Sequence, residues 1–236
     1  MQDTEQMRAE FLRIQNSLKD QLDLTDRFAP DELRTIAGVD LAYWKNGDEE
    51  YAVCCIIVID LCTHEVIAKS RSCGKITVPY MPGFLAFREL PLVEAAAAKL
   101  AVKPDLYMFD GNGCLHPRHM GIASHASFLL NAPTIGVAKT YFRVRPDTDC
   151  PEPEQTAGSW CDIIVDGITY GRVLRTHDGV KPVFVSAGNH ICLDTAVRLT
   201  MQLVNHESRI PIPTRLADLE THIARDELSC RNLAEI

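Results

Sequence analysis

The order of the expected secondary-structure elements limits this chain to few folds. Three strand-like segments follow one another at 35–44, 51–60 and 64–72, and the first two are separated by Lys45-Asn46-Gly47-Asp48. Asn-Gly tolerates positive φ, so this sequence favours a tight hairpin. After residue 80, helical periodicity alternates with short apolar strands. The order predicts an α/β fold whose mixed sheet has three antiparallel strands, then a β-α-β unit, and is flanked by helices. The other expected elements are helices at 5–23, 92–100 (with Pro91 in its first turn), 118–130, 191–204 and 214–228, strands at 105–110, 133–138 and 183–186, and a hairpin over 161–176 that turns at Asp166-Gly167.

The composition favours one globular domain over residues 1–236. The chain is 46% hydrophobic, enough to bury a full core, and no apolar run reaches the roughly 18 residues that a membrane span needs. The polar, acidic start has no signal-peptide pattern, and nine cysteines are scattered without a CxxC pair. We therefore expect reduced thiols, a cytoplasmic location and no membrane partner. The acidic, Pro-rich segment 146–160 is expected to be a loop within this domain.

The net charge argues against a nucleic-acid partner, whereas the charge distribution allows one. The chain carries a formal charge of -8 and has a pI near 5.5, which is not typical of nucleic-acid-binding proteins. Between Arg71 and Arg145, however, lysines and arginines outnumber acids. A local basic surface that includes Arg88, Arg118 and Lys139 is therefore expected on an acidic protein.

Two apolar segments each carry an aspartate that a buried strand does not ordinarily hold. Asp110 closes the run Leu106-Tyr107-Met108-Phe109, and Asp40 interrupts the run from Ile36 to Tyr43. A carboxylate is rarely buried without a partner, and open α/β sheets bind ligands at the carboxyl ends of their strands. With Glu89, these acids predict a divalent-cation site, because oxygen ligands select hard cations that activate water against phosphodiesters.

Glu89, and Asp218 near the end of the chain, also have simpler interpretations. Glu89 could form an exposed ion pair with the neighbouring Arg88. Asp218 is expected in the first turn of a helix, where its carboxylate could simply interact favourably with the helix dipole. A zinc site is a separate alternative, since zinc prefers nitrogen and sulfur ligands. Its candidate ligands, at an irregular spacing, are Cys114, His116, His119 and His125.

Seven motifs between Gly38 and His190 resemble those of the endonuclease V family, and the resemblance covers the chain from about residue 9 to residue 225. They occur in the order that the family shows, and the second contains a Pro-Tyr-Met-Pro sequence. The motifs are Gly38-Val39-Asp40-Leu41-Ala42-Tyr43, the segment from Val78 to Glu89, Phe109-Asp110-Gly111-Asn112-Gly113, His116-Pro117-Arg118, Gly121-Ile122-Ala123-Ser124-His125, Pro133-Thr134-Ile135-Gly136-Val137-Ala138-Lys139 and Val185-Ser186-Ala187-Gly188-Asn189-His190.

The resemblance implies a ribonuclease H-like fold and an endonuclease that uses Mg²⁺ or Mn²⁺. Members of the family cut DNA, and in some cases RNA, at the second phosphodiester 3′ to inosine, leaving a 3′-hydroxyl and a 5′-phosphate. By resemblance, Asp40, Asp110 and Glu89 bind the metal, while Lys139 and Asp218 complete the catalytic set. The same analogy implies a monomer.

The resemblance also implies a substrate-binding set. Pro79, Tyr80 and Pro82 match the family's strand-separating wedge, in which two prolines stiffen a loop around an aromatic ring. The flipped base would then be read in a pocket. Read without the resemblance, Tyr80 would simply pack under a turn, His116 would be structural and Lys139 would be a solvated lysine. The remaining implied substrate-binding residues are Gly83, Leu85, Arg88, Gly111, His116 and Gly136.

Two other functions remain open on the sequence. A transposase or resolvase of the same fold would share the acidic site but would lack the wedge and the hypoxanthine pocket. A non-catalytic nucleic-acid-binding module would keep only the fold, and the presence of Asp40, Glu89, Asp110 and Lys139 together argues against it.

Overall fold

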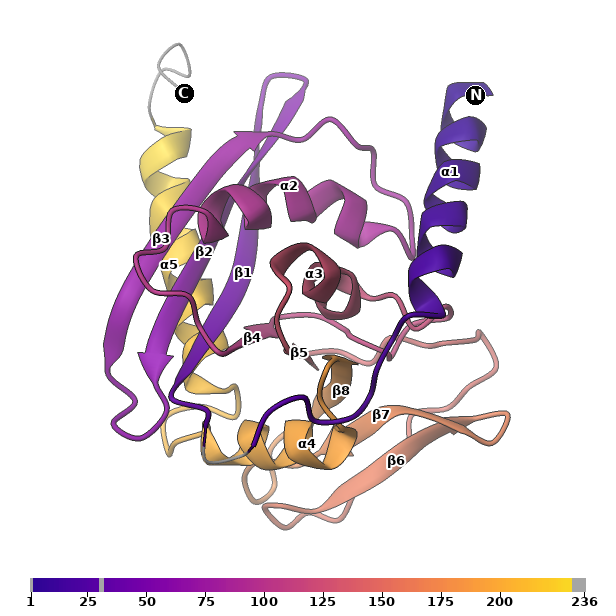
Figure 1. Cartoon of the computed structure of the whole chain (residues 1–236), viewed down its shortest axis with the longest axis vertical. Helices are drawn as coiled ribbons and strands as arrows, with labels where there is room; N and C mark the ends of the chain where they lie inside the picture. The colour runs from indigo at the N-terminus through magenta and orange to yellow at the C-terminus, as the bar shows by residue number, and fades with distance from the viewer. Residues whose placement is uncertain (1, 30–31, 231–236) are drawn as a thin grey trace.

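A computed structural model describes residues 2–29 and 32–230 of the chain. One eight-stranded sheet runs through it in the order β3-β2-β1-β4-β5-β8-β7-β6 (Figure 1). The strands are β1 (Thr35–Asn46), β2 (Glu49–Asp60), β3 (Val66–Lys75), β4 (Leu106–Phe109), β5 (Thr134–Ala138), β6 (Trp160–Val165), β7 (Ile168–Leu174) and β8 (Val183–Asn189). The helices are α1 (Gln2–Lys19), α2 (Leu85–Ala97), α3 (Ile122–Leu130), α4 (Leu193–Gln202) and α5 (Ile212–Ser229).

The mixed character of the sheet, and with it the α/β fold class, is confirmed. Strands β1, β2 and β3 pair antiparallel, and β4 and β5 then join β1 as parallel neighbours. The tight turns after Asn46 and at Asp166-Gly167 are present, with φ of +61° at Gly47 and +75° at Gly167. The sequence did not predict that β8, β7 and β6 continue the same sheet beyond β5 as antiparallel strands.

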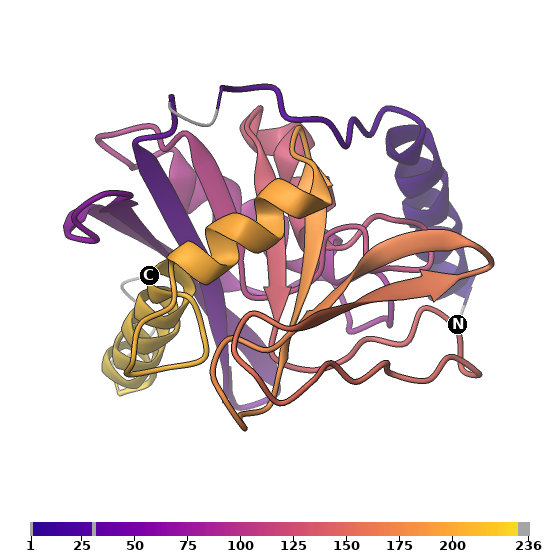
Figure 2. The ribbon, with the colours of Figure 1, turned by 90° about the horizontal axis from the view of Figure 1, so that it is seen from below.

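Helices cover both faces of the sheet, so the core has two apolar layers. On one face, Leu90, Val93 and Ala96 of α2 and Ala123 and Ala126 of α3 pack against residues of β1, β2 and β4. On the other face, buried residues of α4 and α5 cover β1, β4, β5 and β8. The views from the front and from below show α2 and α3 on the side of the sheet opposite to α4 (Figures 1 and 2).

A glycine in β1 brings α5 unusually close to the sheet. A Cβ atom at Gly38 would lie 2.0 Å from the carbonyl oxygen of Pro213 and 2.6 Å from the amide nitrogen of Thr214. Only glycine therefore permits the first turn of α5 to rest on the backbone of β1. This contact places the next turn of α5 beside the carboxyl half of β1.

Helices α2, α3 and α5 do not begin where the sequence predicts, and two of these differences bear on the site. Helix α2 begins at Leu85, so Pro91 lies inside it and Glu89 is a helical residue. The helix tolerates the lost Pro91 donor because its buried face holds it on the sheet. Helix α3 begins only at Ile122, after a turn in which His119 has a φ of +55°. Helix α5 begins at Ile212, so Asp218 lies in its second turn, beyond the first-turn position expected of a dipole-stabilising carboxylate.

None of the helices in the described ranges is long and apolar enough to cross a membrane.

Candidate active site

Asp40 and Asp110 lie side by side at neighbouring strands of the sheet. Strands β1 and β4 are parallel, with Val39 paired to Phe109, and the amide of Asp110 donates a hydrogen bond to the carbonyl of Val39 at 3.1 Å. Both aspartates therefore follow paired residues, near the carboxyl end of β4. This is the placement that the two interrupted apolar segments predicted.

Asp218 of α5 completes a cluster of three carboxylates. One carboxylate oxygen of each of Asp40, Asp110 and Asp218 lies within 4.8 Å of the other two. Within the described part of the chain, this is the only group of three or more His, Cys, Asp or Glu residues close enough to hold one metal ion. We call Asp40, Asp110 and Asp218 the acidic triad.

Lys139, just after β5, provides the cation that the acidic triad contacts in this structure. Its Nζ lies 2.6 Å from Oδ2 of Asp110 and 2.7 Å from Oδ1 of Asp218. Burial opposes its charge, but the hydrogen bonds to the two carboxylates outweigh that effect and raise the pKa of Lys139. The amine is therefore a permanent positive charge, and a compact cation already fits between these oxygens.

The three carboxylates of the acidic triad repel one another, and the single charge of Lys139 does not neutralise all of them. Burial, followed by the neighbouring charge of Asp110, raises the pKa of Asp40 to about 8. Burial also raises the pKa of Asp110, although the hydrogen bond from Lys139 opposes it. Three carboxylates with one lysine are thus an oxygen-rich, electron-rich set, which is the donor chemistry that a hard divalent cation requires.

Thr221 is a neighbour of the acidic triad that sequence reasoning missed. Its hydroxyl is fully buried, lies 3.3 Å from Oδ2 of Asp40, and donates at 2.7 Å to the carbonyl of Asp218. Asp218 and Thr221 are three residues apart on α5 and so share one helix face. That spacing was a signal that could have found Thr221.

Glu89 is buried near the acidic triad but is not part of it. The hydroxyl of Tyr43, on β1, donates a hydrogen bond to Oε1 of Glu89 at 2.5 Å. Burial raises the pKa of Glu89 to about 7, and the charge of Asp110 contributes to this rise. Tyr43 was missed because its aromatic ring reads as an ordinary strand residue.

The exposed ion pair between Arg88 and Glu89 that the sequence allowed is wrong. Both side chains are buried, and Arg88 pairs instead with Glu50 of β2 at 2.6 Å. Arg88 also donates to the carbonyl of Val78 at 2.8 Å and lies 4.9 Å from the ring centre of Tyr43. Its guanidinium therefore fastens the segment before the wedge to the sheet and leaves little of its surface for a ligand.

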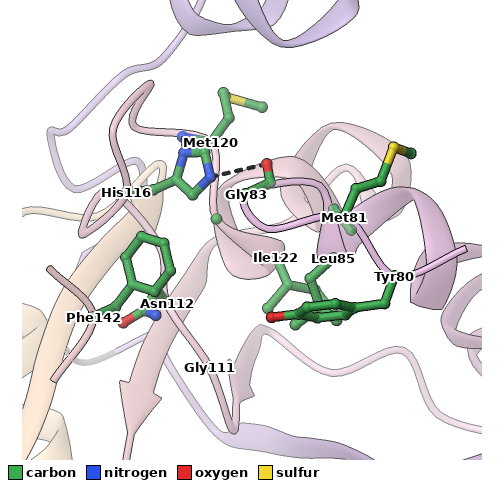
Figure 3. A pocket seen from close by; sticks show the side chains of 12 residues that line it. Tyr80, Met81, Gly83, Leu85, Gly111, Asn112, His116, Met120, Ile122 and Phe142 are labelled. Atoms are coloured by element: carbon green, nitrogen blue, oxygen red, sulfur yellow. Dashed lines mark hydrogen bonds between the residues drawn. The ribbon is translucent and has the colours of Figure 1, made fainter. Parts of the chain in front are cut away.

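A pocket of about 160 Å³ opens next to the acidic triad. His116 and Phe142 lie on one side of it, and Tyr80 and Leu85 lie on the other (Figure 3). Tyr80 is 69% exposed, so the idea that it packs under a turn is wrong. The lining residues are Tyr80, Met81, Gly83, Leu85, Ala86, Gly111, Asn112, His116, Met120, Gly121, Ile122 and Phe142.

Five of the expected substrate-binding residues line this pocket, and four do not. Tyr80, Gly83, Leu85, Gly111 and His116 are in its wall. Of the others, Pro79 and Pro82 are exposed and flank Tyr80, and Arg88 is held by Glu50. Gly136 lies in β5 behind the pocket, where a Cβ atom would come within 2.4 Å of the amide nitrogen of Gly113. Its small size thus allows the Gly111–Gly113 segment to lie against the sheet.

Asn112 is the most informative pocket residue that the sequence did not single out. Its Oδ1 atom is buried and has no hydrogen-bond partner among the residues that the structure describes. A buried acceptor without a partner is costly, so a ligand donor that reached this oxygen by a small rotation of the Asn112 side chain would relieve that cost. Asn112 was overlooked because Asn beside glycine reads as turn chemistry.

The zinc alternative is wrong. Cys114, His116, His119 and His125 are all described, yet they do not form a group close enough to share an ion. The Cys114 thiol contacts Ser124 and the carbonyl of Gly188, His119 stacks on Tyr170 at 4.4 Å, and His125 meets Phe87 edge-on at 4.8 Å. Each side chain is used within the fold.

The fold and the site together define a class: an α/β protein with an acidic site that could bind a metal, next to a partly apolar pocket. Comparison with known proteins makes this specific. The family model described as endonuclease V matches residues 16–219. Endonuclease V of Bacillus subtilis (strain 168) is 56% identical over 216 residues, which are 92% of this chain and 90% of the relative. The chain belongs to the endonuclease V family and is an endonuclease.

Solved structures agree with this assignment. A crystal structure of the Bacillus subtilis endonuclease V superposes with a TM-score of 0.91 at 55% identity, covering 94% of this chain and 93% of the other. Endonuclease V of Ciona intestinalis, solved with a 24-mer DNA that contains an inosine followed by a ribo-adenosine, gives a TM-score of 0.81 at 27% identity. The superposition covers 95% of this chain and 99% of that one.

Proposed function

We propose that this protein is a metal-dependent endonuclease that recognises inosine and hydrolyses the second phosphodiester 3′ to it, leaving a 3′-hydroxyl and a 5′-phosphate. One observation carries the proposal. Asp110 of the acidic triad is followed directly by Gly111 and Asn112, which line the pocket. A base held in the pocket would therefore lie close to the carboxylates, with its own strand leading past them. The inosine-containing DNA in the Ciona relative supports the choice of base.

Mg²⁺ is the metal that we assign to the acidic triad, and Mn²⁺ should substitute for it. Asp40, Asp110 and Asp218 would hold the ion, with the buried Glu89 as a further carboxylate of the site. When bound, the metal supplies an activated water and neutralises charge on the phosphoryl oxygens. The hydroxyl of Thr221 binds the backbone carbonyl of Asp218, and the hydroxyl of Tyr43 holds the Glu89 carboxylate in place.

Lys139 supports the proposal through its position and its permanent charge. Its Nζ lies between Asp110 and Asp218, and its side chain is about one-third exposed. A phosphate that reaches the triad would thus meet an ammonium group that needs no proton uptake. We assign Lys139 to the scissile phosphate or to the attacking water.

The pocket suits hypoxanthine because Asn112 offers a hydrogen-bond acceptor and because the pocket wall leaves no room for an added amino group. Hypoxanthine carries a proton on N1, which the unpartnered Oδ1 of Asn112 could accept, whereas adenine has an acceptor at N1 and would leave Asn112 unsatisfied. Guanine adds a 2-amino donor. Gly83, Leu85 and Gly111 would exclude it by leaving neither room nor an acceptor for that group.

Tyr80 would separate the strands so that the base can leave the stack. Its ring is exposed at the pocket between Pro79 and Pro82. Because the prolines restrict the loop, inserting the ring into a duplex costs little ordering. Insertion would replace the stacking that a flipped nucleotide loses.

We also propose a cytoplasmic monomer. All nine cysteines are free, which suits a reducing compartment. Every carboxylate of the acidic triad, Lys139 and the pocket wall come from one chain, so the site is complete without a second copy.

The test is cleavage of an end-labelled duplex that carries one inosine. Matched duplexes with guanine or adenine at that position are the controls, and a single strand with a ribo-inosine tests RNA. With Mg²⁺, we expect one nick at the second phosphodiester 3′ to inosine, and no nick with EDTA or with Asp110→Asn. A free base with an abasic site would indicate a glycosylase, and equal nicking of the guanine duplex would indicate a nonspecific nuclease.

A further inference from the structure

One carbonyl oxygen at the rim of the pocket receives hydrogen bonds from three side chains. The carbonyl of Gly83 lies 3.0 Å from Nε2 of His116, 2.9 Å from Nη2 of Arg118 and 3.1 Å from Nε2 of Gln15. Figure 3 shows the His116 bond as a dashed line. A carbonyl oxygen has two lone pairs and ordinarily accepts at most two hydrogen bonds. Three donors on this oxygen therefore restrain Gly83 more than an ordinary backbone carbonyl is restrained.

The tautomer of His116 follows from its other contacts. Its Nδ1 accepts from the amides of Arg118 at 3.2 Å and Met120 at 3.3 Å. Because Nδ1 is an acceptor, Nε2 carries the proton and donates to Gly83. His116 thus ties two pocket residues, Gly83 and Met120, to the turn that precedes α3.

Gln15 of α1 also links Gly83 to Met120, through its side-chain amide. Its side chain is fully buried, and its Nε2 donates to the carbonyls of Gly83 at 3.1 Å and Met120 at 3.3 Å. Its Oε1 accepts from Nε of Arg118 at 2.6 Å. Every polar atom of this buried amide is therefore used, and all its partners line the pocket or hold its rim.

Helix α1 is held beside the pocket by an apolar anchor as well. The ring of Phe11 stacks on that of Phe87 at 3.9 Å and lies 5.9 Å from that of Phe84. Figure 1 shows α1 at the edge of the molecule, beyond the end of α2. Gln15 also lies one residue before the range that the family model matches, and none of its hydrogen bonds reaches the acidic triad or Lys139.

We propose that Gln15 is a positioning residue that holds the rim of the pocket, through Gly83, Met120 and Arg118, in the shape that receives the flipped base. The inference rests on the proposed function, because it assigns a role within that pocket. Without Gln15, the rim would have to become ordered as the base binds, so affinity would fall. The acidic triad would be unchanged, so the rate at saturation would stay the same.

The test is steady-state cleavage of the inosine duplex by the full chain carrying Gln15→Met. Methionine is similar in length but makes none of the three hydrogen bonds. We expect KM to rise about tenfold, equivalent to about 1.4 kcal/mol, while kcat stays within about twofold. Binding of the same duplex in Ca²⁺, without cleavage, should weaken by the same factor.

Two further variants separate positioning from general loosening of α1. Leu18→Ala shortens an apolar side chain of the same helix, which lines a surface groove together with Phe87 and Leu90, but it removes no bond to the rim. It should leave KM within about twofold. Gln15→Glu keeps the acceptor for Arg118 and loses both donations, so it should also raise KM, and it replaces Gln15→Met if that variant does not fold.

The outcomes distinguish this inference from the function on which it rests. An active wild type with an unchanged KM in both Gln15 variants would overturn only the role of Gln15. A fall in kcat at unchanged KM, or an equal rise in KM for Leu18→Ala, would do the same. A wild type that does not cleave the inosine duplex would overturn the proposed function as well.

Discussion

Replacing Asp40 with asparagine should stabilise the metal-free protein while it destroys activity. Burial and the charge of Asp110 raise the pKa of Asp40 from 3.8 to about 8. Between these values the folded protein holds a proton that the unfolded chain has released, so the stability of the wild type falls as pH rises from about 4 to 8. Asparagine carries no charge to bury, and its advantage should therefore be small near pH 4 and largest above pH 8.

The size of this effect follows from the same shift. A pKa that moves from 3.8 to about 8 sets a ceiling of about 6 kcal/mol at pH 8, since each factor of ten is worth about 1.4 kcal/mol. Asp40 is partly exposed, so solvent relaxation reduces the effect and we expect about 2 to 3 kcal/mol. For a chain of this length, that corresponds to a rise in Tm of about 5 to 10 °C.

The assay is urea unfolding in EDTA at pH 5 and pH 8, with Asp147→Asn as a matched control. Asp147 is an exposed loop residue, and its replacement should change little. Adding Mg²⁺ should stabilise the wild type, by about 2.7 kcal/mol at a hundred times Kd, but not Asp40→Asn. The reasoning is refuted if Asp40→Asn is less stable than the wild type at pH 8 in EDTA, or if the difference between them is the same at both pH values.

Three further predictions follow from the site. With limiting Mn²⁺, cleavage should decline below about pH 8, because protons compete with the metal for Asp40. A higher Mn²⁺ concentration should shift the pH–rate profile to lower pH, and a profile that does not change with Mn²⁺ concentration would contradict this. Tyr80→Ala should lower kcat/KM at least tenfold on an inosine duplex and little on a single strand, whereas Tyr80→Phe should behave like the wild type; equal losses on both substrates would exclude a wedge. Lys139→Met should lower the log–log salt slope of DNA binding by about 1. Arg88→Met should leave the slope unchanged and cost about 1 to 2 kcal/mol in urea unfolding, because it removes the bonds of the buried Arg88 guanidinium to the partly exposed Glu50 and to the carbonyl of Val78.

Much of the sheet could be predicted because its signals are local. The hairpin after Asn46 and the strands β1, β2 and β4 are visible as apolar periodicity bounded by turn residues. The position of Asp40 beside Asp110 also followed, since each is a charged break in an apolar segment and the two segments lie on neighbouring parallel strands. The errors at Pro91 and Asp218 arose where tertiary packing extends a helix beyond the limit that local preference suggests.

What the sequence determined by itself is the α/β order, the two strand aspartates and the motif family. The tertiary structure decided which side chains use which partners. Arg88 forms an ion pair with Glu50, and Glu89 accepts a hydrogen bond from Tyr43. Asp218 of α5 lies beside Asp40, and the buried Gln15 donates to the carbonyl of Gly83. These partners are tens of residues or more apart. Hydrophobic periodicity records which face of an element is buried, but not which polar group from a distant segment meets it there, because that depends on how whole elements pack.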